Sequence, residues 1–415
     1  MKSAVFGSSA PRITDCFGLE VTIEDSGSLK LFNDYAHGLL AQSSGVRVIL
    51  DAADADAEAC VVNAHAAALL LARGSSRGFK AARKYVLRAR ACVRYANERE
   101  KLFGSAIYDW WRGESRSGLM RLVALLTQWP GDVTGALWAY QLAYNLGDAQ
   151  CMHLVGETLV AASDRCAFAW GIHALALEQA GRVAEAERAA RRGLELSRSD
   201  PWAQLAMARV FYARGLMAEG ARFMTGCRPD WLTLNVDMRR HLHAHLALFH
   251  LLEGNVSQAL RIFDSQIAGV CPGSARQHIE TISFLWRLEL EGHHAGDRWL
   301  AISEGIEARW HEHILPMNDL HFVYALARGG RAQACQALLG SMERKGEQDN
   351  SGLWDSVVVP AARGLVACAG GNADLGAARI AAVLPRLHLA GGSRQQGHAF
   401  ERMAFAAQRL FQKAS

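Results

Sequence analysis

The histidines of this sequence have the clearest chemical potential, because sixteen are present and several lie close together. The segment RRHLHAHLALFH carries His241 and His245, four residues apart. On a helix, this spacing places both imidazoles on one face, where they can bind a ligand or contribute to a metal site. Neither a third metal ligand nor a His-Glu-x-x-His motif accompanies them, so we expect no metal site. The alternative is a polar helix face with hydrogen-bonded imidazoles.

A second group of polar side chains lies in WHEHILPMNDLHF, which contains Asp319 and His321. Asp319 can orient His321 as a general base if both side chains face one groove. Alternatively, Asn318 and Asp319 begin the next helix and accept hydrogen bonds from its first backbone N–H groups. His321 and Asp319 are therefore candidate catalytic residues, with helix capping as the competing interpretation.

Two further segments have a structural and a functional interpretation. His65 lies in the apolar run NAHAAALLL, where it either packs in the core or lines a groove. The segment LAGGSRQQGHAF, which includes Gln396, either cradles an anion at the start of a helix or connects two helices. The sequence lacks phosphate-loop, dinucleotide-binding and serine-hydrolase motifs. Any cofactor is therefore unknown, and whether the protein is an enzyme stays open.

Regularly spaced glycines indicate how these residues are positioned. A helical hairpin needs a left-handed residue where its first helix ends, and glycine adopts that conformation without steric cost. Spacings of 34 or 35 residues, widening later to between 38 and 41, separate Gly78, Gly113, Gly147, Gly181, Gly215, Gly254, Gly292, Gly330 and Gly371. Small residues repeat with them, since Ala174 and Ala208 are also 34 residues apart. A period of this length is typical of tetratricopeptide repeats.

Apolar residues recur with the 3.6-residue period of a helix, and almost no segment alternates as a strand does. We therefore predict an all-α fold, an α-solenoid of about nine tetratricopeptide-like hairpins that forms a right-handed superhelix. We expect cap helices over residues 1–50, regular repeats over 51–225, and longer repeats with a C-terminal cap over 226–415.

Composition narrows the classes of partner and the cellular compartment. The formal charge is +4, from 45 basic and 41 acidic residues that are interspersed, so nucleic acid is not expected as a partner. No apolar run approaches the length of a membrane span, and the first twenty residues lack the apolar core of a secretory signal. Nine cysteines without a Cys-x-x-Cys pair favour reduced thiols. We therefore expect a cytoplasmic protein that binds no membrane.

From about residue 13 to 405, the chain resembles the tetratricopeptide repeat protein 38 family. The resemblance rests on strings that keep their order along the chain, including ITDCFGLEVT, ANEREKLFGSA, HAHLALFHLLEGNVSQALRIFD, HILPMNDLHF and GGSRQQ. It implies a helical-repeat fold with a shared polar pocket. The residues of this chain that match that pattern are His65, His241, His245, Asp319, His321 and Gln396. Phe103 and Tyr140 stand where relatives often carry histidine.

Two hypotheses of function follow. In the first, a binding or scaffold protein holds a protein segment or small ligand on its concave surface. In the second, an enzyme or small-molecule binder, with or without a metal ion, brings these residues together in the superhelix interior. His65, His241, His245 and Gln396 are then ligand-binding candidates. A protein, a peptide or a small molecule is the expected partner, and a homodimer is an open alternative.

Overall fold

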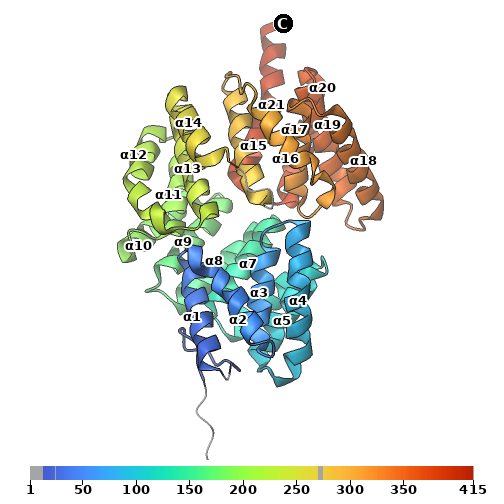
Figure 1. Ribbon diagram of the computed structural model, residues 1–415. Helices are drawn as coiled ribbons and strands as arrows, with labels where there is room; N and C mark the ends of the chain where they lie inside the picture. Colours follow the sequence, from blue (N-terminus) through green and yellow to red (C-terminus); the bar gives the residue numbers. More distant parts are fainter. Residues whose placement is uncertain (1–12, 24, 270–273, 415) are drawn as a thin grey trace, which may run out of the picture. The chain divides into compact units, whose positions relative to one another are not determined.

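The computed structural model describes residues 13–23, 25–269 and 274–414, with side chains up to residue 405. Within these ranges the chain contains 21 α-helices joined by turns and short 3-10 or π segments (Figure 1). The β pairing in the described ranges is limited to one isolated bridge between Thr14 and Glu20. The predicted all-α fold is confirmed. Residues 1–12 and 24 of the expected N-terminal cap, and Cys271, lie outside the described residues.

The described chain divides into two compact units. The first comprises residues up to 71 together with 81–139, and the second comprises 72–80 together with 140–415. Two helices contribute to both units, namely α4 (Ser76–Cys92) and α7 (Val133–Asn145). The boundaries expected at residues 50 and 225 came from repeat spacing and stay a prediction.

The first unit is built from short helices around an apolar core. Besides its parts of α4 and α7, it contains α1 (Ser26–Leu40), α2 (Val48–Ala55), α3 (Cys60–Leu71), α5 (Glu98–Trp111) and α6 (Ser115–Gln128). Asp25 and Asn97 begin α1 and α5 by accepting a backbone N–H of the first turn. The core also encloses an ion pair, in which Arg99 Nη1 lies 2.6 Å from Asp132 Oδ2.

The second unit stacks helical hairpins. Its helices are α8 (Ala149–Ala162), α9 (Ala167–Gln179), α10 (Val183–Leu196), α11 (Pro201–Ala213), α12 (Met217–Cys227), α13 (Val236–Leu252), α14 (Val256–Ile262), α15 (Ala275–Leu290), α16 (Arg298–Glu307), α17 (Pro316–Arg328), α18 (Ala332–Gln348), α19 (Val359–Ala369), α20 (Ala373–Val383) and α21 (Arg394–Ala414). From α9 onward, each odd-numbered helix up to α17 contacts its hairpin partner and the next odd-numbered helix. This pattern is that of an α-solenoid, with the odd-numbered helices forming its inner layer.

Glycine turns define the hairpins in the described part of the chain. Nine glycines with positive φ connect α3 to α4 and each later pair up to α19 and α20, namely Gly74, Gly113, Gly147, Gly181, Gly215, Gly254, Gly292, Gly330 and Gly371. Eight of these positions were predicted from their spacing. The predicted Gly78 was wrong, because it lies inside α4, whereas Gly74 has φ 58° and precedes that helix.

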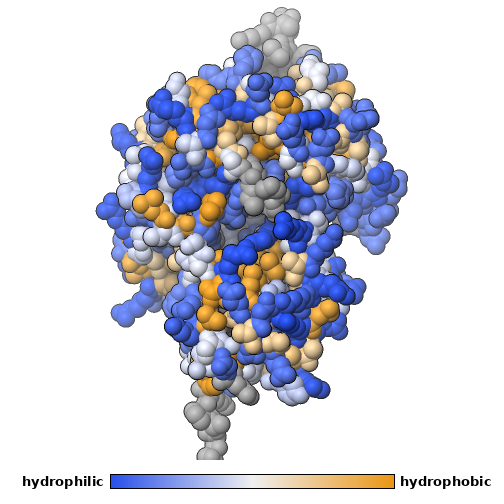
Figure 2. Space-filling view, in the orientation of Figure 1, coloured by the Kyte–Doolittle hydropathy of each residue, from blue (hydrophilic) through white to orange (hydrophobic). Residues whose placement is uncertain are grey.

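Small residues let the stacked helices approach closely. Ala174 on α9 and Ala208 on α11 are fully buried. A Cβ atom added to Gly171 on α9 would lie 2.7 Å from the Cβ atom of Trp202 on α11. Because such a contact is too short for two carbon atoms, the packing of α9 on α11 requires glycine at this position. On the face shown in Figure 2, hydrophilic residues are spread widely, with smaller apolar groups between them.

Candidate functional site

Two adjoining pockets open among the inner helices of the second unit. They measure about 980 and 540 Å³, counting the space that opens to solvent. Tyr144, His241, Ile279, Glu280 and Gln396 line both pockets, which therefore form one continuous site. All lining residues belong to the second unit and come from residues 72–74, 315, 390–396 and the helices α7, α9, α11, α13, α15 and α17.

One wall of the site is a C-terminal segment, residues 388–402, that folds back over the inner helices. Gln179 on α9 donates to the carbonyl of Gly392 over 3.0 Å, and its own side-chain carbonyl accepts the backbone N–H of Arg394. Arg287 on α15 donates to the carbonyl of Gln395. Helix α21 also packs on α15 and α20. Three elements far apart in the sequence therefore hold this segment.

The close approach of the C-terminal segment depends on glycines. Gly391 and Gly392 have φ values of 84° and 87°. A Cβ atom on Gly391 would overlap the carbonyl oxygen of Asn145, and one on Gly392 would lie 2.7 Å from Gln396 Oε1. A Cβ atom on Gly147 would overlap the carbonyl oxygen of His388. These positions leave no space for a larger side chain, so they fix the segment against α7.

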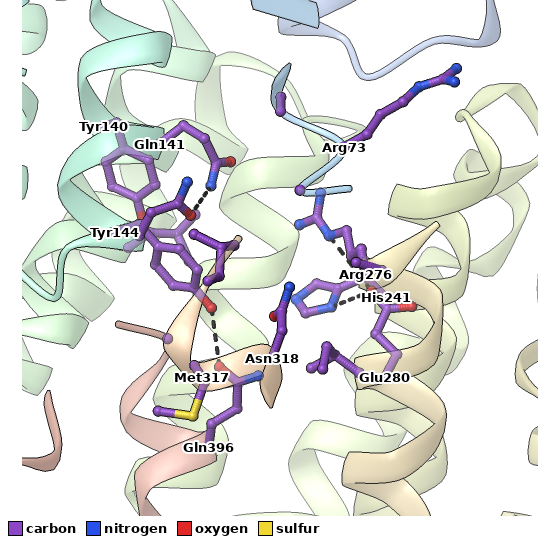
Figure 3. A pocket seen from close by; sticks show the side chains of 18 of the residues that line it. Arg73, Tyr140, Gln141, Tyr144, His241, Arg276, Glu280, Met317, Asn318 and Gln396 are labelled. Carbon is purple, nitrogen blue, oxygen red and sulfur yellow. Dashed lines mark hydrogen bonds and ion pairs between the residues drawn. The ribbon is translucent and has the colours of Figure 1, made fainter. Parts of the chain in front are cut away.

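A polar wall is formed by α13 and α15. His241 Nδ1 lies 3.0 Å from Glu280 Oε1, and Arg276 Nε lies 3.7 Å from the same oxygen (Figure 3). Burial raises the pKa of Glu280 to about 8. Burial, followed by the charges of Arg276 and Arg209, holds the pKa of His241 well below its usual value. At neutral pH both groups are therefore mainly uncharged, and the Glu280 carboxyl donates its proton to His241 Nδ1.

The opposite wall carries Tyr140, Gln141 and Tyr144 of α7, with Gln396 beside them (Figure 3). The Tyr144 hydroxyl donates to Gln396 Oε1 over 3.3 Å, and the same oxygen accepts the backbone N–H of Ser393. Gln396 therefore joins the folded-back segment to α7. Between the two walls, Leu175, Leu205, Ile279, Leu315 and Met317 supply apolar surface.

Several buried polar atoms around the site lack a hydrogen-bond partner among the described residues. They are Glu280 Oε2, His245 Nδ1, and Nε and Nη1 of Arg209. Arg209, only 5% exposed, lies 3.6 Å from Glu178 Oε2, which is too long for a hydrogen bond. These atoms have almost no accessible surface, so they lie behind the pocket walls, and a molecule in the pockets would reach them only after a side-chain movement.

Three of the residues predicted as ligand-binding lie on the walls of this site. His241 and Gln396 line both pockets, and His245 lines the smaller one. The rings of His241 and His245 meet edge to face with centroids 5.0 Å apart. In the described part of the chain, no group of three or more His, Cys, Asp or Glu side chains is arranged to hold a metal ion. Whether the three residues bind a ligand stays a prediction.

His65 lies elsewhere, in the core of the first unit. Its Nδ1 atom is 3.2 Å from the Tyr35 hydroxyl and 3.3 Å from Trp138 Nε1, and its ring stacks on Phe103 at 4.2 Å. Burial lowers the pKa of His65 to about 3. His65 lines neither pocket. In the structure it is a neutral, hydrogen-bonded core residue, which was the structural interpretation of the sequence.

Asp319 and His321 do not form the expected pair. Both lie in α17, which begins at Pro316, and residues two apart on a helix point to different sides. Asp319 Oδ2 instead accepts from His313 Nδ1 over 2.9 Å, while His321 Nδ1 donates to the carbonyl of Met317 over 2.8 Å. The capping alternative was also wrong, because Leu315 occupies the N-cap position and no side chain caps the helix.

The hydrogen bond from His313 to Asp319 continues to Ser341. His313 Nε2 lies 2.7 Å from Ser341 Oγ, and burial raises the pKa of Asp319 to about 6. The order of groups is that of a serine hydrolase triad. Ser341, however, lies inside α18, where backbone N–H groups are used within the helix and cannot form an oxyanion hole. We therefore interpret these three residues as a structural link between α17 and α18.

Several other residues of the site were not predicted from the sequence. Arg209 is a single charge in the apolar run WAQLAMARVF, and such a residue is seldom buried without a partner. Arg276 and Glu280 are four residues apart, as on one helix face. The lone charge of Arg209 and the spacing of Arg276 and Glu280 are both visible in the sequence and could have identified these residues. Nothing local indicated that Tyr144 would meet a residue 252 positions away.

No family model matches the sequence, so membership of the tetratricopeptide repeat protein 38 family stays a prediction. Two solved structures are similar at low identity. A chain in the crystal structure of the APC/C hetero-tetramer Cut9-Hcn1 has 13% sequence identity to this chain. The match covers 94% of this chain and 78% of that chain, with a TM-score of 0.41. A human IFIT1 dimer with PPP-AAAA is 12% identical, covering 97% of this chain and 90% of that chain, with a TM-score of 0.47. Neither similarity is high enough to carry an argument about function.

No described helix has the length and apolar character that crossing a membrane requires. The eight cysteines in the described part are free thiols. The predicted cytoplasmic location rests on the sequence and stays a prediction.

Proposed function

We propose that this protein binds a small molecule in the two adjoining pockets of its second unit. The observation that carries the proposal is the lining of the two pockets, where the polar groups of His241, Glu280 and Gln396 lie beside apolar side chains. A concave site that combines apolar walls with a few convergent polar groups is typical of small-molecule binding. A ligand with an apolar body and polar groups would fit this lining.

The C-terminal segment supports a small ligand over a protein segment. In a helical repeat, a peptide partner lies along the inner helices. Here residues 388–402 occupy part of that surface and are held by Gln179 and Arg287. The space that remains is a pair of partly open pockets. A peptide partner would have to displace these contacts first.

Native mass spectrometry of the gently purified full chain tests the proposal. We expect an adduct of small-molecule mass that is released on denaturation. Ala244 lines the smaller pocket on α13, so Ala244→Phe should fill the site and remove the adduct. Ala301, exposed on α16, gives the matched control Ala301→Phe, which should keep it. An adduct that Ala244→Phe leaves unchanged, or a bound polypeptide in its place, would refute the proposal.

Acid-base catalysis in the same site is a second candidate function. One observation favours it: burial places the pKa of Glu280 near 8, within the range of a catalytic acid or base at neutral pH. This pair, Glu280 with His241, differs from the predicted catalytic pair of Asp319 and His321. Once the bound molecule is identified, Glu280→Gln should abolish its conversion while keeping its binding. Conversion by the variant at the wild-type rate would exclude this role.

A further inference from the structure

The charged side chains of the site limit the chemical class of its ligand. Its lining includes four arginines, Arg73, Arg209, Arg276 and Arg287, and one glutamate, Glu280. Arg287 donates to the backbone carbonyls of Ser283 and Gln395. Arg73 points away from the other labelled side chains (Figure 3). The guanidinium groups relevant to a ligand are therefore those of Arg209 on α11 and Arg276 on α15.

We infer that the ligand carries an anionic oxygen group, a carboxylate or a phosphate, that Arg209 and Arg276 bind next to an apolar body. This inference rests on the proposed function, since it concerns the same site. Arg209 carries the argument, because it lines the pocket, is only 5% exposed, and has its ion-pair partner Glu178 Oε2 at 3.6 Å, beyond hydrogen-bond distance. A guanidinium is always charged and has five N–H donors, which match the oxygens of a carboxylate or phosphate.

The nearby acidic groups leave one of the two arginines without a balancing charge. Glu178 forms an ion pair with Arg209 at 3.6 Å, which balances the charge of Arg209 without a hydrogen bond to Nη1. Glu280 lies 3.7 Å from Arg276 and shares a hydrogen bond with His241. Because burial keeps Glu280 mainly protonated at neutral pH, it compensates little of the charge on Arg276. An anion would supply the missing negative charge.

Apolar surface next to these arginines favours a ligand with a hydrophobic body. Leu205 lies one helical turn before Arg209, and Ile279 lies one turn after Arg276. Trp202 and Tyr140 add aromatic surface to the same pocket. An anion bound at the arginines can therefore extend an aliphatic or aromatic part across these side chains, with the Glu280 carboxyl available as a further hydrogen-bonding group.

Ligand-observed NMR on the full chain tests this class with three probes. These are 4-phenylbutanoate, phenyl phosphate and the neutral 4-phenylbutanamide. We expect at least one anion to bind about tenfold or more tightly than the amide, since a charged hydrogen bond contributes roughly 1.5–3 kcal/mol, equivalent to about tenfold to a hundredfold in affinity. Binding of phenylbutanoate alone identifies the group as a carboxylate, binding of phenyl phosphate alone identifies a phosphate, and binding of both supports the shared chemistry.

Two variants test whether the arginines cause the tighter binding of the anions. Arg276→Gln removes a half-exposed charge and should weaken anion binding about tenfold, without affecting the amide. Arg209→Met combined with Glu178→Gln removes both members of the buried pair, so that no isolated buried charge remains. Arg222→Met, with a side chain 76% exposed on α12, is the control and should bind as wild type.

The outcomes separate this inference from the proposed function. Equal binding of amide and anions, lost in Ala244→Phe, would overturn the anionic class and leave the pocket as the binding site. Anion binding that both arginine variants retain would also overturn the inference. If no probe binds while the native adduct is present, the anionic class fails and the proposed function stands.

Discussion

Replacing Glu280 by glutamine should change how stability depends on pH. Burial raises the pKa of Glu280 from 4.5 to about 8, so the folded chain retains a proton that the unfolded chain releases at lower pH. The folded state thus binds more protons, and stability is lost as the pH rises through the interval between the two pKa values. Glutamine cannot ionise, and its side-chain amide can still donate to His241 Nδ1.

The magnitude follows from the two pKa values of Glu280. Between pH 6.5 and 8, ionisation of the carboxyl lowers the free energy of the unfolded state by about 1.5 multiples of 2.303RT, one for each pH unit. Partial ionisation in the folded state lowers the free energy of that state by about 0.3 of such a multiple. At about 1.36 kcal/mol per unit, the wild-type chain should lose about 1–2 kcal/mol relative to Glu280→Gln. The wild-type chain and Glu280→Gln carry the same buried histidines, whose contributions therefore cancel from the difference.

Urea unfolding followed by tryptophan fluorescence at four pH values between 6.5 and 8 measures this difference. Glu304→Gln is the control, because that side chain is 61% exposed on α16, and we expect its stability to follow the wild type. If Glu280→Gln and wild type lose stability in parallel, Glu280 is ionised in the folded state. The neutral pair with His241 and the positive charge assigned to the site would then both be wrong.

Three further predictions concern packing. Gly391→Ala should destabilise the chain more than Gly371→Ala. Both glycines have positive φ, which costs alanine about 1–2 kcal/mol, but only a Cβ atom at Gly391 would also meet a carbonyl oxygen. Thermal unfolding and limited proteolysis of the C-terminal segment measure the difference, and equal losses of stability would contradict the close approach. Phe400→Ala removes a fully buried ring and should cost about 3–5 kcal/mol by urea unfolding; a loss below about 1 kcal/mol would mean that α21 is not docked. Arg99→Met leaves a buried carboxylate unpaired and should cost about 3–5 kcal/mol in the first unit, whereas an unchanged thermal midpoint would place that pair in solvent.

The repeat could be predicted because its signal is local. A left-handed turn after each first helix needs glycine, so glycine spacing predicts the hairpins without knowledge of long-range packing. The one error, Gly78 in place of Gly74, arose where two glycines stand four residues apart and spacing alone cannot choose between them.

The candidate site could be predicted only in part. His241 and His245 were identified because their spacing places them on one helix face. The pairing of Asp319 was wrong because residues two apart diverge on a helix, while His313 adopts a left-handed conformation with φ 45° and its ring meets Asp319 from outside α17. The contacts of Gln396 and Arg209 depend on how distant helices stack, which the sequence of one helix does not contain.

The fold-back of the C-terminal segment also sets the order in which the site is completed during synthesis. The hairpins of the second unit make contacts between neighbours and can assemble as they leave the ribosome. The pocket wall joins Tyr144 to Gln396, 252 residues later, so a nascent chain has its helical stack before it has its binding site. A ligand that requires this wall binds only chains that have docked the segment, and by mass action it stabilises that finished state.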